Sequence, residues 1–499
     1  MKKLIAVLLL VAMALTLVLT SCGGGEMPTT AETTTNAPTT TKGQVPDLDP
    51  DDAVDIEDFT MPEGGFDTTK PVTITFYHTM GANLREVLDR YVVEFNKLYP
   101  NITVKHEQVG GYDDVRDQIS TEIPAGLQPN IAYCYPDHVA LYNIAKAVQT
   151  LDTLIGSTVT VTRADGTTET IGLTEAQLND FIPGYYEEGK QFGDNKMYSL
   201  PFSKSTEVLY YNKTFFEKHN LQVPTTWDEM EALMKKIIEI DPMCIPLGYD
   251  SESNWFITMC EQLGSDYTSA TGEHFLFDNE TNRNFVKRFR EWYQNGYVTT
   301  QELFGAYTSG LFVTTDEINS YMSIGSSAGS THQRPAKING EYPFEVGIAP
   351  IPQIDPSNPK VISQGPSVTI LKDDNPQEVL ASWLFIKYLT TSTDFQAEFS
   401  MASGYVPVLK SVGEHPVYKA EFLDKANGGE YIAALSAKIC LEQTDAYYTS
   451  PAFNGSSKAR SQVGALLSAV ISASAEDIGS DVDAYIKKQF EKALQECRS

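Results

Sequence analysis

The strongest constraint on the fold is a strand, helix and strand pattern that begins near residue 70. Residues 72–78 (VTITFYH) alternate apolar and polar side chains with the period of a β-strand. Apolar residues then recur at helical spacing from Leu84 to Leu98, Pro100 ends that pattern, and residues 102–109 form a second strand-like run. Parallel strands need a helical crossover between them, so these short connections predict a βαβ unit and an α/β fold.

Local signals further along the chain predict more elements of the same kinds. The Asp-Gly dipeptide at 165–166 predicts an exposed hairpin over residues 159–171, with no chemistry attached to it. A capping box of Thr226 and Glu229 begins a core-facing helix, and Pro376 begins another helix with a strongly apolar sequence. Helices and strands therefore alternate over most of the chain.

The N-terminal residues have the pattern of an export signal followed by a spacer. Two lysines precede an apolar run over residues 4–19, and these roughly 16 residues fall short of the roughly 20 that span a bilayer. The string LTSC that ends at Cys22 resembles the lipobox of bacterial lipoproteins, which implies a signal peptide over residues 1–22 and lipidation of Cys22. Residues 23–70 hold 11 Thr and 11 acidic against 2 basic side chains, which predicts a disordered tether.

Composition excludes several classes of protein. The 499 residues suffice for two or three domains, and 66 acidic against 37 basic side chains give a net charge of −29, which repels a nucleic acid. The five cysteines beyond Cys22 have no zinc-like spacing, so we expect buried thiols, no metal site and no cofactor. A disulfide between Cys244 and Cys260 is the alternative in an exported chain.

Six strings in a fixed order carry a resemblance to a known family. The firmest is MYSLPFSKSTEVLYYNKTFFEKHNLQVPTTWDEM over residues 197–230. The others are FYHTMG at Phe76, GGYDDV at Gly110, SYMSIGSSAG at Ser320, FEVGIAPIP at Phe344 and SGYVPV at Ser403. Together they make residues 71–499 similar to extracellular solute-binding proteins of ABC importers, the family that includes maltose-binding and glycerol-3-phosphate-binding proteins.

The resemblance implies a two-lobed fold of the type II periplasmic-binding-protein kind, in which each lobe is a mixed sheet flanked by helices. Lobe one is expected to comprise residues 71–208 plus 347–398, and lobe two residues 209–346 plus 399–499. The ligand cleft would lie at the hinge between them. The implied function is that of a non-catalytic, monomeric lipoprotein, anchored on the extracytoplasmic face of the cell membrane, that captures a sugar or oligosaccharide and delivers it to an ABC permease.

A sugar offers flat C–H faces and a fringe of hydroxyls, so its site needs aromatic surfaces and short polar side chains. The resemblance places candidate ligand contacts at Tyr112, Asp137, Ser205, Trp255, Phe256, Ser326, Ser327, Gly365 and Tyr405. Several of them have a structural alternative. The indole of Trp255 and the ring of Phe256 suit a helix core, Asp137 suits a helix start, and Gly365 suits an ordinary turn.

Two rival functions remain. The glycerol-phosphate branch has a phosphate-binding arginine where the best local alignment puts Thr449 or Ser450, and Arg460 falls further along. A neutral sugar is therefore favoured over glycerol-3-phosphate or a glycerophosphodiester, and a polyol stays open as an alternative ligand. Residues 325–329 also satisfy the G-x-S-x-G pattern of hydrolases, although no glycine run for an oxyanion hole precedes them. A secreted glycosidase is less favoured, because no pair of carboxylates stands out.

Overall fold

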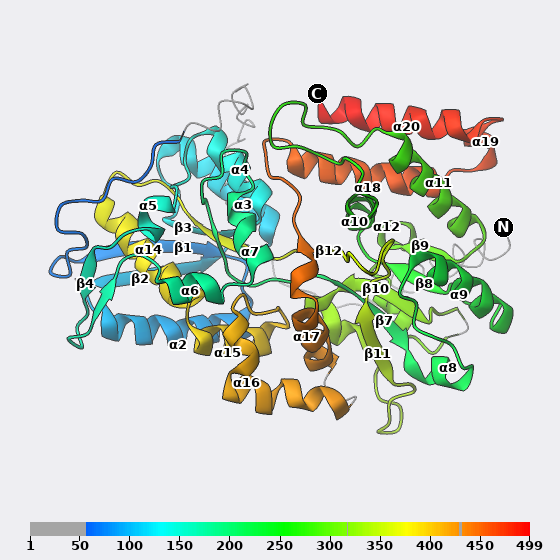
Figure 1. Cartoon of the computed structure of the whole chain (residues 1–499), viewed down its shortest axis with the longest axis horizontal. Coiled ribbons are helices and arrows are strands. Elements are labelled where there is room, and N and C mark those ends of the chain that lie inside the picture. The colour runs from blue at the N-terminus through cyan, green and yellow to red at the C-terminus, as the bar shows by residue number, and fades with distance from the viewer. Residues whose placement is uncertain (1–55, 317, 429–431) are drawn as a thin grey trace, which may run out of the picture. The chain divides into compact units, whose positions relative to one another are not determined.

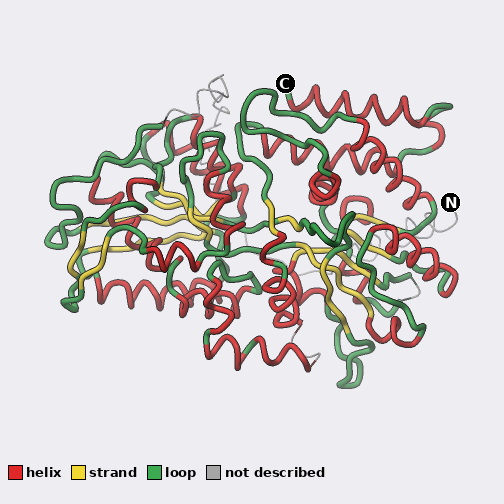
Figure 2. The backbone as a smooth tube through the Cα atoms, viewed as in Figure 1, coloured by secondary structure: helices red, strands yellow, loops and turns green. Residues whose placement is uncertain are grey.

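Two lobes make up the part of the chain that the computed structural model describes, which comprises residues 56–316, 318–428 and 432–499. These residues belong to one compact unit. Each lobe holds a five-stranded sheet, and the two groups of strands are separate in Figure 2. The predicted signal peptide, Cys22 and residues 23–55 of the predicted tether lie outside the described residues.

The first lobe contains the βαβ unit that opens the sequence pattern. Its sheet has the order β2-β1-β3-β13-β6, with β1 parallel to β2 and β3, and β13 antiparallel to both of its neighbours. The strands are β1 (Val72–His78), β2 (Ile102–Gln108), β3 (Ile131–Cys134), β6 (Leu200–Pro201) and β13 (Ser367–Ile370). The helices are α2 (Ala82–Leu98), α3 (Tyr112–Glu122), α4 (Pro136–Ile144), α5 (Asp152–Ile155), α6 (Glu175–Asp180), α7 (Pro183–Glu187), α14 (Pro376–Thr390) and α15 (Thr393–Ser403). The predicted strand, helix and strand are thus confirmed.

Helices cover both faces of this first sheet. Figure 1 shows α2 and α15 on one side of it, and α3 and α4 on the other. Helix α2 buries one stripe, formed by Val87, Leu88, Tyr91 and Phe95, as its helical spacing predicts. Helix α14 is buried almost all round, because it packs between the sheet and neighbouring elements.

The second lobe has a sheet of order β11-β7-β10-β8-β9, in which β8, β9 and β10 are parallel and β7 is antiparallel to β10 and β11. Its strands are β7 (Glu207–Asn212), β8 (Leu247–Tyr249), β9 (Val298–Thr300), β10 (Met322–Ser326) and β11 (Val346–Pro350). Its helices are α8 (Lys213–Lys218), α9 (Trp227–Ile240), α10 (Glu252–Leu263), α11 (Glu280–Gln294), α12 (Gln301–Phe304), α13 (Ser309–Val313), α16 (Pro416–Glu421), α17 (Ile432–Glu442), α18 (Ser456–Ser472), α19 (Ala475–Ile478) and α20 (Val482–Cys497). The predicted capping box of Thr226 and Glu229 begins α9.

Three segments connect the lobes and are hydrogen-bonded to one another. They are residues 202–206 between β6 and β7, residues 351–366 between β11 and β13, and residues 404–409 after α15. Lys204 exchanges two backbone hydrogen bonds with Val406, at 2.6 and 3.1 Å, and Ser205 exchanges two with Gln364, at 2.8 and 2.9 Å. Within the second segment, β12 (Val361–Ile362) pairs with β14 (Tyr447–Tyr448). The connections therefore form a joined strip rather than three separate linkers.

These connections lie a few residues from the predicted lobe boundaries. The boundary expected after residue 208 falls inside β7, the one after 346 falls inside β11, and the one after 398 falls inside α15. Strands β7 and β11 pair with each other in the sheet of the second lobe, whereas α15 contributes to the hydrophobic core of the first lobe. Apolar periodicity identifies each element, but it carries no information about which sheet the element joins.

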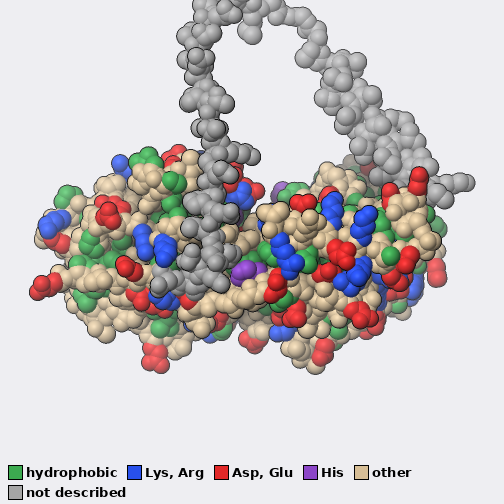
Figure 3. Space-filling model, turned by 90° about the horizontal axis from the view of Figure 1, so that it is seen from above, with side chains coloured by type: hydrophobic (Ala, Val, Ile, Leu, Met, Phe, Trp, Pro, Cys, Tyr) green, Lys and Arg blue, Asp and Glu red, His purple; other side chains and the backbone are tan. Residues whose placement is uncertain are grey.

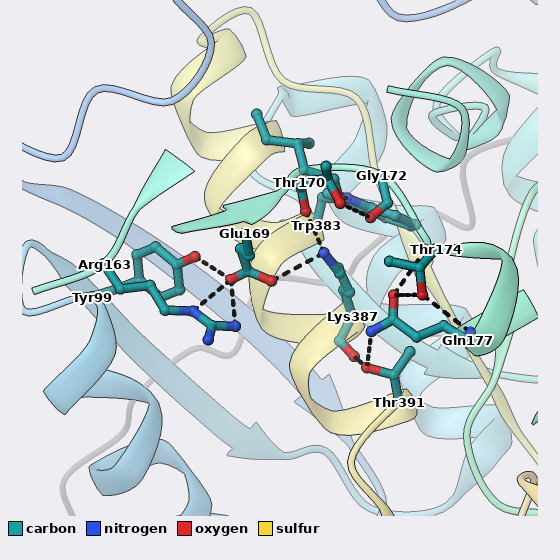
Figure 4. A network of polar contacts seen from close by, with 11 residues as sticks. Tyr99, Arg163, Glu169, Thr170, Gly172, Thr174, Gln177, Trp383, Lys387 and Thr391 are labelled. Atoms are coloured by element: carbon teal, nitrogen blue, oxygen red, sulfur yellow. Dashed lines mark hydrogen bonds and ion pairs between the residues drawn. The ribbon is translucent and has the colours of Figure 1, made fainter. Parts of the chain in front are cut away.

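The hairpin predicted over residues 159–171 is present, with β4 (Thr160–Thr162) paired to β5 (Thr168–Thr170). Figure 4 shows that polar contacts join it to Lys387 of α14. The Glu169 carboxylate accepts from Arg163 at 2.8 Å and from Lys387 of α14 at 3.0 Å. Beside it, the Trp383 indole donates to the Ile171 carbonyl at 2.7 Å. The hairpin is therefore fastened to a helix more than two hundred positions later in the sequence.

Residues 56–70, which the sequence assigns to the tether, instead pack on the first lobe. Ile56, Phe59 and Phe66 are buried there. The Asp58 carboxylate pairs with Lys196 at 3.1 Å, and Gln377 of α14 accepts from the Asp67 N–H at 2.7 Å. The average composition of the stretch predicted disorder, but these apolar side chains find a surface to cover. The prediction of a disordered tether is thus wrong for these residues.

Candidate ligand-binding site

A cavity of about 710 Å³ lies between the two lobes and is lined by both. Residues 135–137 follow β3, Asp250 follows β8, Gln301 follows β9, and Ser326 ends β10. The carboxyl ends of strands in open α/β sheets are the usual place for a ligand, and the volume suits a small molecule. The position of the cavity therefore follows from the topology of the two sheets.

Three tyrosines contribute aromatic surface to the cavity: Tyr135, Tyr267 and Tyr307. Tyr307 is 66% exposed, which leaves its ring open to the cavity and the solvent. Burial raises the pKa of Tyr135 and that of Tyr267 well above the ordinary value, so both hydroxyls stay protonated. A protonated phenol can both donate to and accept from a ligand hydroxyl.

A buried network on the wall of the cavity is centred on Glu207, at the start of β7. Its carboxylate accepts from the Tyr249 hydroxyl at 2.6 Å and from the Asn254 amide at 2.9 Å. The Asn254 carbonyl oxygen in turn accepts from the Arg460 guanidinium of α18. Burial raises the pKa of Glu207 to about 7, although the two hydrogen bonds and the Arg460 charge oppose the rise. Arg460 is thereby held at the cavity by an amide.

A buried ion pair joins the cavity to the connecting strip. The Lys204 ammonium lies 2.5 Å from the Glu188 carboxylate, and both side chains are almost completely buried. The same ammonium donates to the Ser367 hydroxyl at 2.9 Å and to the Gly365 carbonyl at 3.0 Å. Burial raises the pKa of Glu188 and lowers that of Lys204, and each charge opposes the shift of the other. Glu188, although it lines the cavity, is thus already neutralised.

Three of the predicted contact residues line the cavity: Asp137, Ser326 and Gly365. Asp137 lies in the first turn of α4, after Pro136, and its side chain is only 21% exposed. Gly365 has a positive φ of 94°, and a Cβ there would lie 2.6 Å from the Ser203 carbonyl oxygen. Gly365 is therefore needed where the backbone of residues 203–205 passes close to it, within the connecting strip.

Four predicted residues lie next to the cavity but do not line it. The hydroxyls of Tyr112 and Tyr405 are 3.1 Å apart, and the Tyr112 ring packs 4.5 Å from that of Tyr135. Ser205 is buried in the connecting strip, and Ser327 is buried with its hydroxyl accepting from the Thr206 N–H at 3.1 Å. These residues pack beside or behind residues that line the cavity.

Trp255 and Phe256 correct the prediction most clearly. Both side chains are fully buried in the core of the second lobe. The Trp255 ring stacks 3.8 Å from Phe289 and 4.7 Å from Tyr249. The structural alternative, an aromatic pair in a helix core, describes both residues, because the face of α10 that carries them turns toward α11 and not toward the cavity.

Sequence reasoning missed several polar residues that do line the cavity, among them Glu207, Asp250, Asn254 and Arg460. Glu207 carried a signal, since it is a charged residue within the apolar run EVLYYN. Asn254 directly precedes Trp255, so the correct helix was chosen but the wrong face. Arg460 falls further along the chain than the position aligned with the phosphate-binding arginine, yet α18 brings its guanidinium to the cavity.

Other features of the described residues bear on the remaining predictions. All five cysteines beyond Cys22 are buried, and Cys260 is a free thiol, so the proposed bond from Cys244 to Cys260 is not formed. Within the described ranges, no group of three or more His, Cys, Asp or Glu side chains could hold a metal ion. No helix in those ranges is long and apolar enough to cross a membrane. The face in Figure 3 shows acidic and basic side chains interspersed over its visible parts, without a basic patch.

Comparison with known proteins agrees with this geometry. The chain is 24% identical over 359 residues to the sn-glycerol-3-phosphate-binding periplasmic protein UgpB of Salmonella typhimurium, covering 68% of this chain and 75% of that one. It is 22% identical to the maltotriose-binding protein of Pyrococcus abyssi, covering 69% of this chain and 68% of that one.

Solved structures share the fold. The cyclic alpha-maltosyl-1,6-maltose binding protein from Arthrobacter globiformis superposes with a TM-score of 0.63 at 19% identity, covering 86% of this chain and 99% of that one. UgpB from Mycobacterium tuberculosis, in complex with glycerophosphocholine, does so with a TM-score of 0.63 at 18% identity, covering 85% and 98%. Residues 90–423 match the family profile described as bacterial extracellular solute-binding protein. With its two lobes and the cavity between them, the chain belongs to the bacterial extracellular solute-binding protein family.

Proposed function

We propose that this protein is the substrate-binding component of an ABC importer and that it captures a sugar or oligosaccharide in the cavity between its lobes. One observation carries the proposal: a cavity of about 710 Å³ that both lobes line with tyrosine rings and short polar side chains. Tyrosine rings can stack on the C–H faces of a pyranose, while carboxylates, amides and hydroxyls can bind its hydroxyls.

The charges around the cavity favour a neutral ligand that donates hydrogen bonds. Asp137 and Asp250 line it against the single guanidinium of Arg460, since burial keeps a proton on Glu207 below about pH 7 and Lys204 neutralises Glu188. Carboxylates accept hydrogen bonds from sugar hydroxyls, whereas they repel a phosphate group.

Capture would be coupled to motion at the connecting strip. Hinge closure is the established motion of periplasmic binding proteins. A ligand that touches both walls stabilises the closed state by its difference in affinity between the closed and open states. Here Asp137 lies on the first lobe and Ser326 on the second, so a single ligand can meet both.

Titration calorimetry tests the ligand class. The purified protein would be titrated with maltose, maltotriose, sn-glycerol-3-phosphate and glycerophosphocholine. We expect at least one of the sugars to bind more tightly than either phosphate ester, and small-angle scattering to show that only a bound ligand compacts the protein. Tight binding of a phosphate ester without sugar binding would overturn the sugar assignment.

A glycerol phosphodiester is the second candidate, and the position of Arg460 favours it. The guanidinium reaches the cavity from α18, where it could pair with a phosphate. Arg460→Gln separates the two ligand classes, because a phosphate site loses about 10- to 100-fold in affinity and a sugar site loses little. Lys458→Gln is the matched control, since Lys458 is an exposed cation on the same helix that does not line the cavity.

We further propose that the protein is a monomeric lipoprotein held at the extracytoplasmic face of the membrane through Cys22, where it meets its permease. The export-signal pattern and the LTSC string support this proposal. Detergent phase partitioning of the native protein and of Cys22→Ser tests it, and partitioning of both into the aqueous phase would contradict it. We also propose that the protein has no glycosidase activity, and release of product from labelled oligosaccharides would overturn that statement.

A further inference from the structure

Two side chains of the second lobe meet above Gly325, the residue that opens the G-x-S-x-G string. A Cβ atom built on Gly325 would lie 3.0 Å from Asp250 Oδ2 and 3.2 Å from Gln333 Nε2. Both side chains line the cavity. The absence of a side chain at this position of β10 therefore leaves room for a carboxylate oxygen and an amide to approach the same point.

One carboxylate oxygen of Asp250 accepts hydrogen bonds within the protein, and the other is available to a ligand. Its Oδ1 accepts from the Thr308 N–H at 2.7 Å and from the Thr308 hydroxyl at 2.8 Å. Its backbone N–H donates to the Ile324 carbonyl at 2.9 Å, which fixes the residue at the end of β8. Oδ2 is the oxygen that faces Gly325, and Asp250 lines the cavity. The side chain is thus oriented by two donors to present a single acceptor.

Gln333 supplies an independent observation, since it ends the short 3-10 helix over Ser327–Gln333 with a side chain only 3% exposed. Its Oε1 is buried and accepts no hydrogen bond from any residue that the structure describes. A buried amide oxygen without a partner costs free energy. That cost would be offset by a ligand whose binding turns the amide toward the cavity and donates a hydrogen bond to the oxygen.

We propose that Asp250 and Gln333 form a subsite for a vicinal diol, the pair of adjacent hydroxyls carried by a sugar ring or by a glyceryl group. One hydroxyl donates to Asp250 Oδ2, and its neighbour exchanges hydrogen bonds with the Gln333 amide. An amide and a carboxylate that approach one point match two oxygens on neighbouring carbons better than a single oxygen. This inference rests on the proposed function in that it deepens the same cavity, but it holds for either ligand class.

Gly325→Ala tests the subsite without altering a charge. Gly325 does not have a positive φ, so alanine is tolerated by the backbone, and the added methyl presses only on Asp250 and Gln333. Gly413→Ala is the matched control, because Gly413 also lacks a positive φ, does not line the cavity, and its added Cβ would meet only Leu441 Cδ1, at 4.0 Å. Asp250→Asn and Gln333→Ala remove the polar atoms singly, and thermal unfolding of each variant confirms that it is folded.

The probes are maltotriose, sn-glycerol-3-phosphate and glycerophosphocholine, all of which carry adjacent hydroxyls. For whichever probe binds the wild type, we expect Gly325→Ala and Asp250→Asn to weaken binding about 10- to 100-fold and Gly413→Ala to weaken it less than threefold. If glycerophosphocholine is the probe that binds, 3-hydroxypropyl phosphocholine, which lacks one of its two adjacent hydroxyls, should bind the wild type about 10- to 100-fold more weakly than glycerophosphocholine does. The Asp250→Asn change should then weaken binding of this analogue little further.

The outcomes separate this inference from the proposed function. Sugar binding that survives Gly325→Ala and Asp250→Asn would overturn the subsite and leave the proposed function standing. Binding of a phosphate ester alone, lost in both variants, would overturn the sugar assignment and support the subsite. Failure of the wild type to bind any of the three probes would count against both.

Discussion

Glu207→Gln is expected to make the ligand-free protein more stable at alkaline pH and no more stable at acidic pH. Glu207 is 1% exposed, and its two hydrogen bonds come from neutral groups, Tyr249 and Asn254. Burial raises its pKa from an ordinary 4.5 to about 7. At about 1.4 kcal/mol for each pH unit, ionising this carboxyl in the folded protein costs about 3 kcal/mol more than in the unfolded chain.

The sign follows from proton binding. Between pH 4.5 and 7 the folded protein keeps the Glu207 proton, while the unfolded chain has lost it. The free energy of unfolding therefore falls as the pH rises through this window, and the full loss is present above pH 7. Glutamine has nearly the same shape and never ionises, and its amide can still accept from Asn254. The variant should not lose stability in this way. Its free energy of unfolding, relative to that of the wild type, should therefore rise from about zero at pH 4.5 to about 3 kcal/mol at pH 8.

Urea unfolding followed by circular dichroism at pH 4.5, 6 and 8 measures this difference. Glu239→Gln is the control, since Glu239 is exposed on α9 and should change the free energy of unfolding by less than about 0.5 kcal/mol at every pH. A stability difference for Glu207→Gln that is independent of pH, or a variant that is less stable than the wild type at pH 8, would refute the reasoning.

Three further perturbations test the framework around the cavity. Lys204→Met leaves the Glu188 carboxylate buried without its partner, so the free energy of unfolding should fall by about 3–5 kcal/mol in urea titrations, and adding Glu188→Gln should recover much of it. Trp255→Ala should cost about 3–5 kcal/mol of stability, and Trp255→Phe should keep ligand affinity within about twofold; a large affinity loss in a stable Trp255→Phe protein would mean that the indole contacts the ligand. Lys387→Met should cost about 1–3 kcal/mol, because Glu169 retains Arg163, and no change in the thermal midpoint would show that the hairpin is not fastened to α14.

Local patterns predicted local structure well. The alternation over residues 72–78, the capping box of Thr226 and Glu229, and the helix start at Pro376 all describe interactions among residues close in sequence. Their physical basis is contained in a few neighbouring residues, so the sequence alone is sufficient to specify them.

Long-range assembly decided what could not be predicted. Trp255 suits a stacking surface and a core equally well in a sequence, and only the packing of Phe289 from α11 against it decides between them. Arg460 comes to the cavity through contacts of α18 with α10, which no local pattern encodes. Phe59 and Phe66 were hidden by the average composition of a polar stretch, because a few apolar side chains suffice to dock a segment when a surface is nearby.

The fastening of early segments to α14 and α15 has a consequence for how the chain folds. Asp67 bonds to Gln377, Arg90 to Glu398, and Glu169 to Lys387, so contacts that complete the first lobe span 218 to 310 positions. Strand β13, which separates β3 from β6, also arrives late in synthesis. Until then β3 is paired with β1 alone and its other edge lacks a partner, and a domain built on such distant pairings folds slowly. The N-terminal two-thirds of the chain should therefore stay unfolded as they emerge, which is the state that an export channel can thread.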